Sequence, residues 1–523
     1  MNENAGKRNA ALLTLLPAFG IALGACGGSN ESAAPKMLSV SMYDRGQVSS
    51  EEGTYRNNRW VERIREQSGI YVHFVPVPRM QAQEKLNIMF AAGDAPDLIW
   101  DYDRKYIGML ASQGVIQPVD DFLEAYSTAY KSYLREHPEL KPYLSFNGKM
   151  YAVATKRPVT SVVNHGIWIR QDWLDNLGLA MPRTIDELLD VAKAFRSRDP
   201  DGNGQDDTVA IVGRESPDIY AALYGIHRSE WFVEDGSLQY GPTTDRYKDA
   251  IRLEKQLYDE GLIDTEGKDS VRTWVSGKAG ICLCQWSSFT FDMQLKDLLN
   301  GFPAAKPVPL EPVETERGVY GLYQEEPPFI YVAFNKKMKD PETAVKYLDW
   351  MLEKGWKELA YGTEGVHVRT VNGIPQTIDA EKYRKEVLYA SEYAVLRPEI
   401  VRPSDWSARA APDPLSQRVA GLQTDALRKA LNYTYRRDLP YQPSFVELNE
   451  AIASVGQKFE YFRLKAVREG PAYTPEWAMQ EIRKEWRRIG GVHVEALVRS
   501  WYETNKAGFP NGRPDEHRIG GSP

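Results

Sequence analysis

Cysteine is scarce in this sequence, with three residues among 523, and this scarcity excludes a disulfide framework. Two of the three, Cys282 and Cys284, lie in one apolar run and would point to the same side of a strand. A Cys-x-Cys pair is too close for an easy disulfide, and no histidine lies near enough in sequence to complete a metal site. We therefore expect two buried free thiols, and we expect stability to come from core burial.

Catalytic signatures are also lacking. The chain has seven histidines and no G-x-S-x-G, H-E-x-x-H or Walker A pattern. The carboxylate pairs Asp120–Asp121 and Glu325–Glu326 are adjacent in sequence, so their side chains point apart and do not bracket one glycosidic bond. We expect a protein that is not an enzyme, with a carbohydrate-active enzyme as the less favoured alternative.

An excess of positive charge is absent, because 72 Asp and Glu outnumber 65 Lys and Arg and the net charge is −7. This balance argues against nucleic acid as a partner. Hydrophobic residues make up 42% and charged residues 26%, which is ordinary for a globular protein of two or three domains. Aromatic residues are plentiful, with 13 Trp and 29 Tyr. Such rings stack on sugars and also pack cores, so they favour a carbohydrate ligand only weakly.

The first residues have the pattern of a secretion signal. Lys7 and Arg8 precede an uncharged, mostly apolar run over residues 10–23, which is too short for a comfortable membrane span. Small residues then lead to Cys26. The segment resembles a bacterial lipoprotein signal, which implies cleavage after residue 25 and a diacylglycerol on the Cys26 thiol; the alternative is an ordinary secreted protein. Residues 26–36 would form a lipidated tether at the outer face of the cell membrane, and Gly27 favours a Gram-positive bacterium.

Strand and helix patterns alternate after the tether. We expect strands at 38–42, 70–77 and 97–100, and helices at 55–68 and 80–92, the second of which ends at Gly93. This order is typical of a doubly wound α/β fold, which binds ligands at the carboxyl ends of its strands. The last third is predicted to be largely helical, over 342–353, 414–431, 445–467 and 475–489, and the Gly- and Pro-rich tail from 507 to be flexible.

Six segments, taken in order, are similar to motifs of family 1 extracellular solute-binding proteins. They are residues 90–99 (FAAGDAPDLI), 114–122 (GVIQPVDDF), 147–153 (NGKMYAV), 168–174 (WIRQDWL), 184–188 (TIDEL) and 361–367 (YGTEGVH). The resemblance implies an α/β, two-lobed periplasmic-binding-protein type 2 fold with a hinge and a central ligand cleft. Lobe one would hold residues 37–155 plus 285–345, lobe two 156–284 plus 346–506, and residues 507–523 would be the tail.

The family resemblance also implies a function. It implies a monomeric lipoprotein that hands a carbohydrate, an oligosaccharide that could contain uronate, to the permease subunits of an ABC importer. A peptide or another non-sugar solute is the main alternative ligand. A lipoprotein with a structural or adhesive role is a weaker alternative.

A calcium loop is predicted at residues 199–207 (DPDGNGQDD). Oxygen-bearing side chains stand at loop positions 1, 3, 5 and 9, Gly204 at position 6 permits a sharp bend, and the carbonyl of position 7 can point inward. The usual acidic residue at position 12 is replaced by Ala210. The predicted ligands of a structural Ca²⁺ are Asp199, Asp201, Asn203, Gln205 and Asp207. The alternative is a solvated acidic turn.

Seven residues are candidates for contact with the sugar, because sugar sites combine aromatic platforms with planar hydrogen-bonding groups. They are Trp286, Trp406, Trp100, Arg170, Tyr323, Glu364 and His367. Each has a structural alternative: the tryptophans could pack in a core, and Arg170 could pair with Asp172.

Overall fold

The computed structural model describes residues 36–158, 166–213, 216–227, 230–234, 236–263, 270–284, 289–399, 402–433 and 435–509. All of these belong to one compact unit, Lys36–Pro523. The predicted signal peptide, the lipidation site Cys26 and the candidate Trp286 lie outside the described residues.

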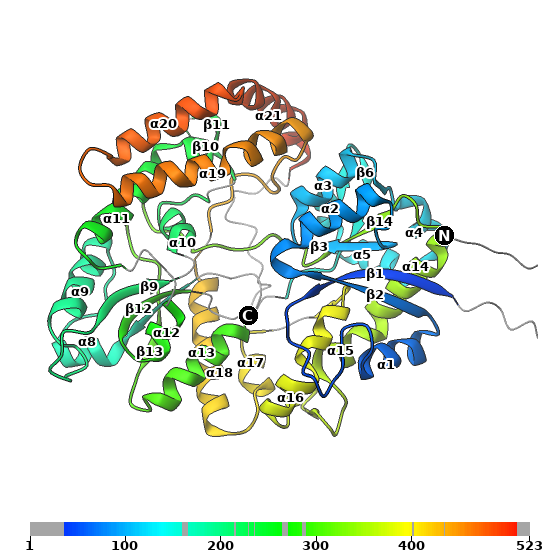
Figure 1. Cartoon of the computed structure of the whole chain (residues 1–523), viewed down its shortest axis with the longest axis horizontal. Coiled ribbons are helices and arrows are strands. Elements are labelled where there is room, and N and C mark those ends of the chain that lie inside the picture. The colour runs from blue at the N-terminus through cyan, green and yellow to red at the C-terminus, as the bar shows by residue number, and fades with distance from the viewer. Residues whose placement is uncertain are drawn as a thin grey trace, which may run out of the picture. The chain divides into compact units, whose positions relative to one another are not determined.

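The first sheet has the strand order β2-β1-β3-β14-β4, with β7 paired to β14. Strands β1 (Met37–Asp44), β2 (Tyr71–Pro78) and β3 (Leu98–Asp101) run parallel, and β14 (Tyr331–Asn335) is antiparallel to β3. Helices α1 (Arg59–Ser68), α2 (Ala82–Ala92), α3 (Arg104–Ser112) and α14 (Pro341–Trp350) pack against these strands (Figure 1). The predicted order of strands and helices is therefore present in the structure.

Local signals explain where these helices begin and end. The Asn58 side chain caps α1 by accepting hydrogen bonds from the amides of Trp60 and Val61. Helix α2 ends at Gly93, which adopts φ 81°. In the motif that follows, Asp97 Oδ2 accepts hydrogen bonds from Ser39 N (2.9 Å) and Ser39 Oγ (2.6 Å), which joins β3 to β1.

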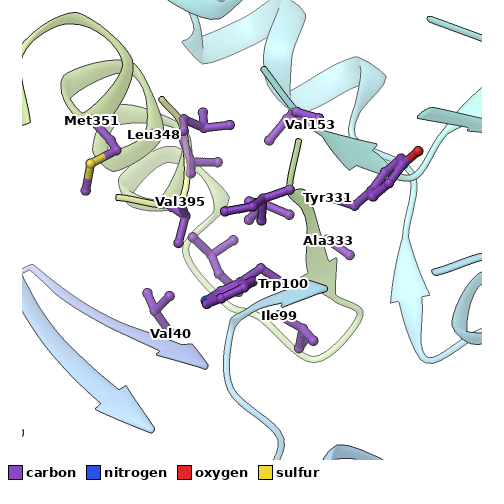
Figure 2. Close-up of a cluster of buried hydrophobic side chains, with 14 of the residues drawn as sticks. Val40, Ile99, Trp100, Val153, Tyr331, Ala333, Leu348, Met351 and Val395 are labelled. Carbon is purple, nitrogen blue, oxygen red and sulfur yellow. The ribbon is translucent and has the colours of Figure 1, made fainter. Parts of the chain in front are cut away.

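Trp100 lies in the core of the first sheet, which favours its packing alternative, and its contact with a sugar stays a prediction. Figure 2 shows the ring among Val40, Val395 and Leu348, and only 1% of the residue is exposed. Side chains alternate along a strand, and here the neighbour Asp101, instead of Trp100, lines a cavity.

The second sheet has the order β13-β8-β12-β9. Its strands are β8 (Gly166–Arg170), β9 (Val209–Gly213), β12 (Ala279–Cys284) and β13 (Pro307–Leu310). Helices α8 (Gln171–Leu177), α9 (Ile185–Ser197), α12 (Ser270–Val275) and α18 (Pro414–Leu431) pack against it (Figure 1).

Cys282 and Cys284 form a disulfide in β12, so the prediction of two free thiols is wrong. The reasoning overlooked the geometry of an extended strand. Residues two apart on one face have their Cα atoms 5.8 Å apart here, which is within the span of a disulfide.

A third core joins the C-terminal helices α19 (Val446–Arg468), α20 (Pro475–Arg488) and α21 (Gly491–Asn505) to α11 (Asp245–Asp259) and to the hairpin of β10 (Trp231–Glu234) and β11 (Ser237–Tyr240). Inside it, the Arg463 guanidinium on α19 pairs with the Glu254 carboxylate on α11, and both side chains are buried.

Other strands and α-helices complete the described part of the chain. They are β4 (Ile116–Gln117), β5 (Ser145–Phe146), β6 (Lys149–Met150), β7 (Ala152–Val153), β15 (Val368–Val371), β16 (Ile374–Thr377), α4 (Asp120–Tyr126), α5 (Ala129–Glu136), α6 (Lys141–Leu144), α10 (Ser216–Leu223), α13 (Phe289–Gly301), α15 (Trp356–Tyr361), α16 (Ala380–Glu386) and α17 (Asp405–Arg409). Within the described part of the chain, no helix is both long and apolar enough to cross a membrane.

Two segments associate differently from the lobes predicted for them. Strand β13 was assigned to lobe one, yet it pairs with β8 of the second sheet. Conversely, residues 347–396 were assigned to lobe two, yet Tyr347, Leu359 and Leu396 belong to the core of the first sheet. The division into lobes, with the bounds given above, stays a prediction.

Candidate ligand-binding site

A first cavity of about 330 Å³ opens at the carboxyl end of β3. Its lining comes from β3 and α3, from His227 and Glu230, and from residues 323–328. The residues that line it are Arg79, Gln83, Asp101, Tyr102, Asp103, Arg104, Lys105, Arg157, His227, Glu230, Tyr323, Glu325, Glu326, Pro328, Tyr331 and Gln442. The predicted candidate Tyr323 is among them.

Asp101 is held in a fixed orientation on the floor of the first cavity. Its Oδ2 accepts a hydrogen bond from Tyr43 Oη (2.8 Å), and its Oδ1 accepts one from the amide of Asp103 (2.8 Å). Burial raises the pKa of Asp101 above its ordinary value, even though these hydrogen bonds act in the opposite direction. The Arg79 guanidinium lies over the Tyr43 ring at 4.6 Å. The Asp101 carboxyl is thus a preorganised hydrogen-bond acceptor, and the Arg79 guanidinium lies on the Tyr43 ring that bonds to it.

Glu230 also lines the first cavity and is almost fully buried. Burial is the main cause that raises the pKa of Glu230 from 4.5 to about 7, and it outweighs the attraction of Arg437, whose guanidinium lies 3.9 Å away. Arg437 donates to the carbonyl of Gln324 (2.7 Å). The Tyr323 ring packs on His227, with ring centroids 4.6 Å apart.

Arg104 anchors the first cavity to the C-terminal part of the chain. Its guanidinium donates to the carbonyls of Tyr143 (3.0 Å) and Gln442 (2.7 Å), and it lies between the rings of Phe146 and Tyr441. The residues after α18 therefore return to the first sheet at this point, although they lie more than 300 positions later in sequence.

A second cavity of about 440 Å³ lies where α15, α16 and β16 meet α13, α17 and α18. The predicted candidate Trp406, on α17, is among its lining residues, and its Nε1 donates to Gln423 Oε1 (2.7 Å). Sequence reasoning missed the charged residues and tyrosines of this cavity, which are Asp292, Lys296, Tyr361, Tyr383, Arg397, Glu399 and Arg409. The signal available was three arginines in a segment with two prolines, at residues 397–409.

Three other candidates have structural partners outside both cavities. Arg170 is the last residue of β8 and pairs with Asp172 (Nε to Oδ1, 2.8 Å). Cys284 of β12 pairs with Gly166, at the other end of β8. Glu364 accepts hydrogen bonds from Thr370 N (2.8 Å) and Thr370 Oγ1 (3.0 Å). These contacts support the structural alternatives for Arg170 and Glu364 and do not place either residue near the cavities.

His367 is also a structural residue here. It is 2% exposed, its Nδ1 accepts from the amide of Thr363 (3.0 Å), and its Nε2 lies 3.0 Å from Glu386 Oε2. The match of residues 361–367 to a family motif thus reflects a tight turn, in which Gly362 adopts φ 82° and a side chain at this position would collide with His367.

The predicted calcium loop connects α9 to β9. Asp199 Oδ2 accepts from the amide of Gly204 (2.9 Å), and Asn203 Nδ2 lies between Asp201 Oδ2 (2.9 Å) and Asp207 Oδ1 (3.2 Å). Lys278 donates to Asp207 Oδ2 (2.8 Å). Among the residues described, no three His, Cys, Asp or Glu side chains form a metal-ligand group.

The chemistry of the loop nevertheless fits a divalent cation. Asp201 Oδ1 is buried and has no hydrogen-bond partner among the described residues, and burial together with the neighbouring Asp199 carboxyl raises the pKa of Asp201 above its ordinary value. The amide group of Asn203 bridges two carboxylates, and a rotation about χ2 would present its oxygen instead.

Curated relatives cover parts of the chain. Fructooligosaccharide ABC transporter substrate-binding protein FusA of Streptococcus pneumoniae is 30% identical over 223 residues, which are 39% of this chain and 41% of FusA. Polygalacturonan/rhamnogalacturonan-binding protein YtcQ of Bacillus subtilis is 27% identical over 383 residues, 68% of this chain and 73% of YtcQ. Lipoprotein LipO of Bacillus subtilis is 36% identical over 39% of this chain and 42% of its own length. The match thus spans about two fifths of FusA and of LipO.

Solved structures share the fold over most of the chain. S. pneumoniae FusA in complex with kestose has a TM-score of 0.70 at 19% identity and covers 90% of this chain and 100% of that one. Alginate-binding protein AlgQ2 without calcium ion has a TM-score of 0.70 at 18% identity, over 90% and 98% of the two chains. A FusA EF-hand mutant in complex with fructo-nystose has a TM-score of 0.68 at 19% identity, over 90% and 100%.

The α/β fold with two mixed sheets is therefore confirmed as that of periplasmic binding proteins. The family model for bacterial extracellular solute-binding proteins matches residues 59–358, more than half of the sequence. The chain belongs to the bacterial extracellular solute-binding protein family.

Proposed function

We propose that this chain is the substrate-binding lipoprotein of an ABC importer and that it binds an oligosaccharide at the two cavities. The observation that carries the proposal is the composition of the first cavity, in which the aromatic rings of Tyr102 and Tyr323 stand beside carboxylates and guanidinium groups. Rings of this kind cover apolar sugar faces, and the charged groups serve the hydroxyls. The names of FusA and YtcQ support a carbohydrate ligand.

Both cavities are lined from more than one core, and this supports a mechanism based on closure. A ligand that contacts both walls is bound best when the walls are close together, so it shifts the population toward the closed state. The permease would recognise that state. This role needs no catalysis, in line with a family of solute-binding proteins.

The anchor and the metal belong to the same proposal. Cys26 would carry the lipid that holds a monomeric protein at the outer face of the membrane. Asp199, Asp201, Asn203, Asp207 and the carbonyl of Gln205 would hold a structural Ca²⁺, which would neutralise the carboxylates of the loop and fix α9 to β9.

The test is a binding panel on the lipid-free protein in calcium-containing buffer. Kestose, trigalacturonate, an alginate trisaccharide and tripeptides would be compared by thermal shift and calorimetry. A ligand at 100 times its Kd stabilises the folded state by about 2.7 kcal/mol, which is measurable. A response to one sugar class supports the proposal, whereas a response to peptides alone would replace carbohydrate with peptide as the ligand.

A pair of tryptophan variants tests the location of the site. Trp406→Leu should weaken sugar binding roughly tenfold, about 1.4 kcal/mol, because the platform at the second cavity is lost. Trp350→Leu, at a half-buried tryptophan outside both cavities, is the matched control and should leave Kd unchanged. Equal effects of the two substitutions would show that sugar does not bind at Trp406.

A further inference from the structure

The second cavity contains one buried carboxylate shared by two guanidinium groups. Arg397 and Arg409 both pair with Glu399, and Tyr361 Oη donates to the same carboxylate. The Glu399 side chain is 2% exposed, and the Arg409 guanidinium lies over the Tyr361 ring at 5.1 Å. Two positive charges therefore share one negative charge.

The rest of the cavity lining does not balance this excess. The other charged residues in the lining are Asp292 and Lys296, which pair with each other at 3.0 Å. The lining of the second cavity thus carries a net charge of +1. A buried charge without a counter-charge is costly, so a ligand that supplies one negative charge gains more here than at the surface.

The same region also has more hydrogen-bond donors than acceptors. Arg397 Nε and Arg409 Nε are buried, and neither has a hydrogen-bond partner among the described residues. Gln423 Nε2 is a third such donor; its residue is 2% exposed, and its Oε1 is already occupied by Trp406 Nε1. These three atoms have almost no accessible surface, so a ligand in the cavity would reach the two guanidinium groups through their other nitrogens, on side chains that are 21% (Arg397) and 22% (Arg409) exposed.

The cluster is held rigidly. Thr155 Oγ1 donates to the carbonyl of Arg397 (3.0 Å) and accepts from its amide (3.2 Å), which fixes this residue to the segment after β7. Trp406 is fixed by Gln423, so its ring and the donors keep their relative positions. Such an arrangement can recognise a planar acceptor beside an aromatic face.

We propose that the second cavity is a subsite for the carboxylate of a uronic acid residue, so that the oligosaccharide bound by this protein is acidic. This inference rests on the proposed function as a carbohydrate-binding protein. A carboxylate matches the single net charge and the planar donor edge of arginine. Neutral hydroxyls would fill the donors but leave the charge unbalanced.

The experiment compares two ligands of the same length on the intact protein. Trigalacturonate and its carboxyl-reduced, neutral counterpart would be titrated by calorimetry into the lipid-free protein. The acidic sugar should bind at least roughly tenfold more tightly, and the difference should shrink as NaCl is raised, because exposed parts of the interaction are screened. Equal affinities for the two sugars would overturn the inference but leave the proposed function intact.

Variants assign the preference to this cluster. Arg409→Gln should abolish the preference, because it weakens binding of the acidic ligand only. Glu399→Gln removes one negative charge from the lining, so it should strengthen binding of the acidic ligand only. Arg369→Gln is the control, because Arg369 is exposed and its side chain bonds to Gln376. A preference that survives Arg409→Gln refutes the assignment. If Arg409→Gln does not fold, the Glu399→Gln result and the wild-type ligand pair decide. Binding of neither sugar, with binding of peptide, would instead refute the proposed function.

Discussion

The buried carboxyl group of Glu230 should make the stability of the protein depend on pH in a predictable direction. In the native state the pKa of Glu230 is raised from 4.5 to about 7, chiefly by burial, and the nearby carboxylates of Glu326 and Glu325 add to the effect against the attraction of Arg437 and Lys105. Replacing Glu230 with Gln keeps the shape of the side chain but removes the titration.

The magnitude follows from the two pKa values. Below pH 4.5 the carboxyl is protonated in both the native and the unfolded state, so its titration does not change the free energy of unfolding. Between pH 4.5 and 7 the unfolded chain releases the proton while the native state retains it, and the free energy of unfolding falls. Above pH 7 both states are ionised and the loss is complete. One pKa unit corresponds to about 1.4 kcal/mol, so the full loss is about 3 kcal/mol.

The assay is urea denaturation of wild type and Glu230→Gln at pH 4.5, 6, 7 and 8. Relative to wild type, the variant should gain about 3 kcal/mol of stability between pH 4.5 and pH 8, with most of the gain below pH 7. Taking the difference cancels the titration of the other groups. Glu316→Gln, at an exposed position, is the control and should show no pH-dependent difference. A constant difference between Glu230→Gln and wild type at all four pH values would refute the reasoning.

Three further predictions concern the metal loop and the cores. Asp199→Ala should lower the melting temperature when calcium is present and have little effect in a chelator; equal losses in both conditions would refute a calcium site. Arg463→Met should cost about 3–5 kcal/mol in chemical denaturation, because Glu254 is left buried and unpaired, and adding Glu254→Met should recover most of the loss. Trp100→Ala should cost about 3–5 kcal/mol through the cavity it creates. The Kd of the folded Trp100→Ala protein for sugar should match wild type, and a large change would show that Trp100 contacts the ligand.

The pattern of the sequence predicted the elements of the fold well wherever apolar residues are periodic. Helix α18 has the predicted bounds, and β1 and β2 begin within one residue of prediction. The local pattern of apolar residues predicts such helices and strands, because each helix or strand buries one or both of its faces whatever the rest of the chain does. The association of β13 with β8 depends on pairing between distant segments, which no local pattern encodes.

The candidate site was predicted less well, for a related reason. A strand pattern located Trp100 and Asp101 at the end of β3, but which of the two faces a cavity depends on the register of the sheet. The motif at residues 361–367 identified a conformation, and His367 serves the turn itself through Thr363. Tyr323 and Trp406 were predicted as aromatic residues in segments that resemble cleft-lining parts of the family, and both line cavities.

The cluster around Glu399 shows what sequence reasoning lacks at such a site. Its members come from α15, the loop before α17 and α17 itself, and only the fold brings them together. Leaving buried donors such as Gln423 Nε2 without a partner costs about 1–3 kcal/mol each. Departures from complete hydrogen bonding are expected where a protein is built for a ligand. Unpaired donors alone do not locate such a site, since the Nε1 atoms of Trp100, Trp231 and Trp274, one in each core, also have no partner among the described residues. The net positive charge of the cavity lining therefore locates the site better than either the unpaired donors or the aromatic rings.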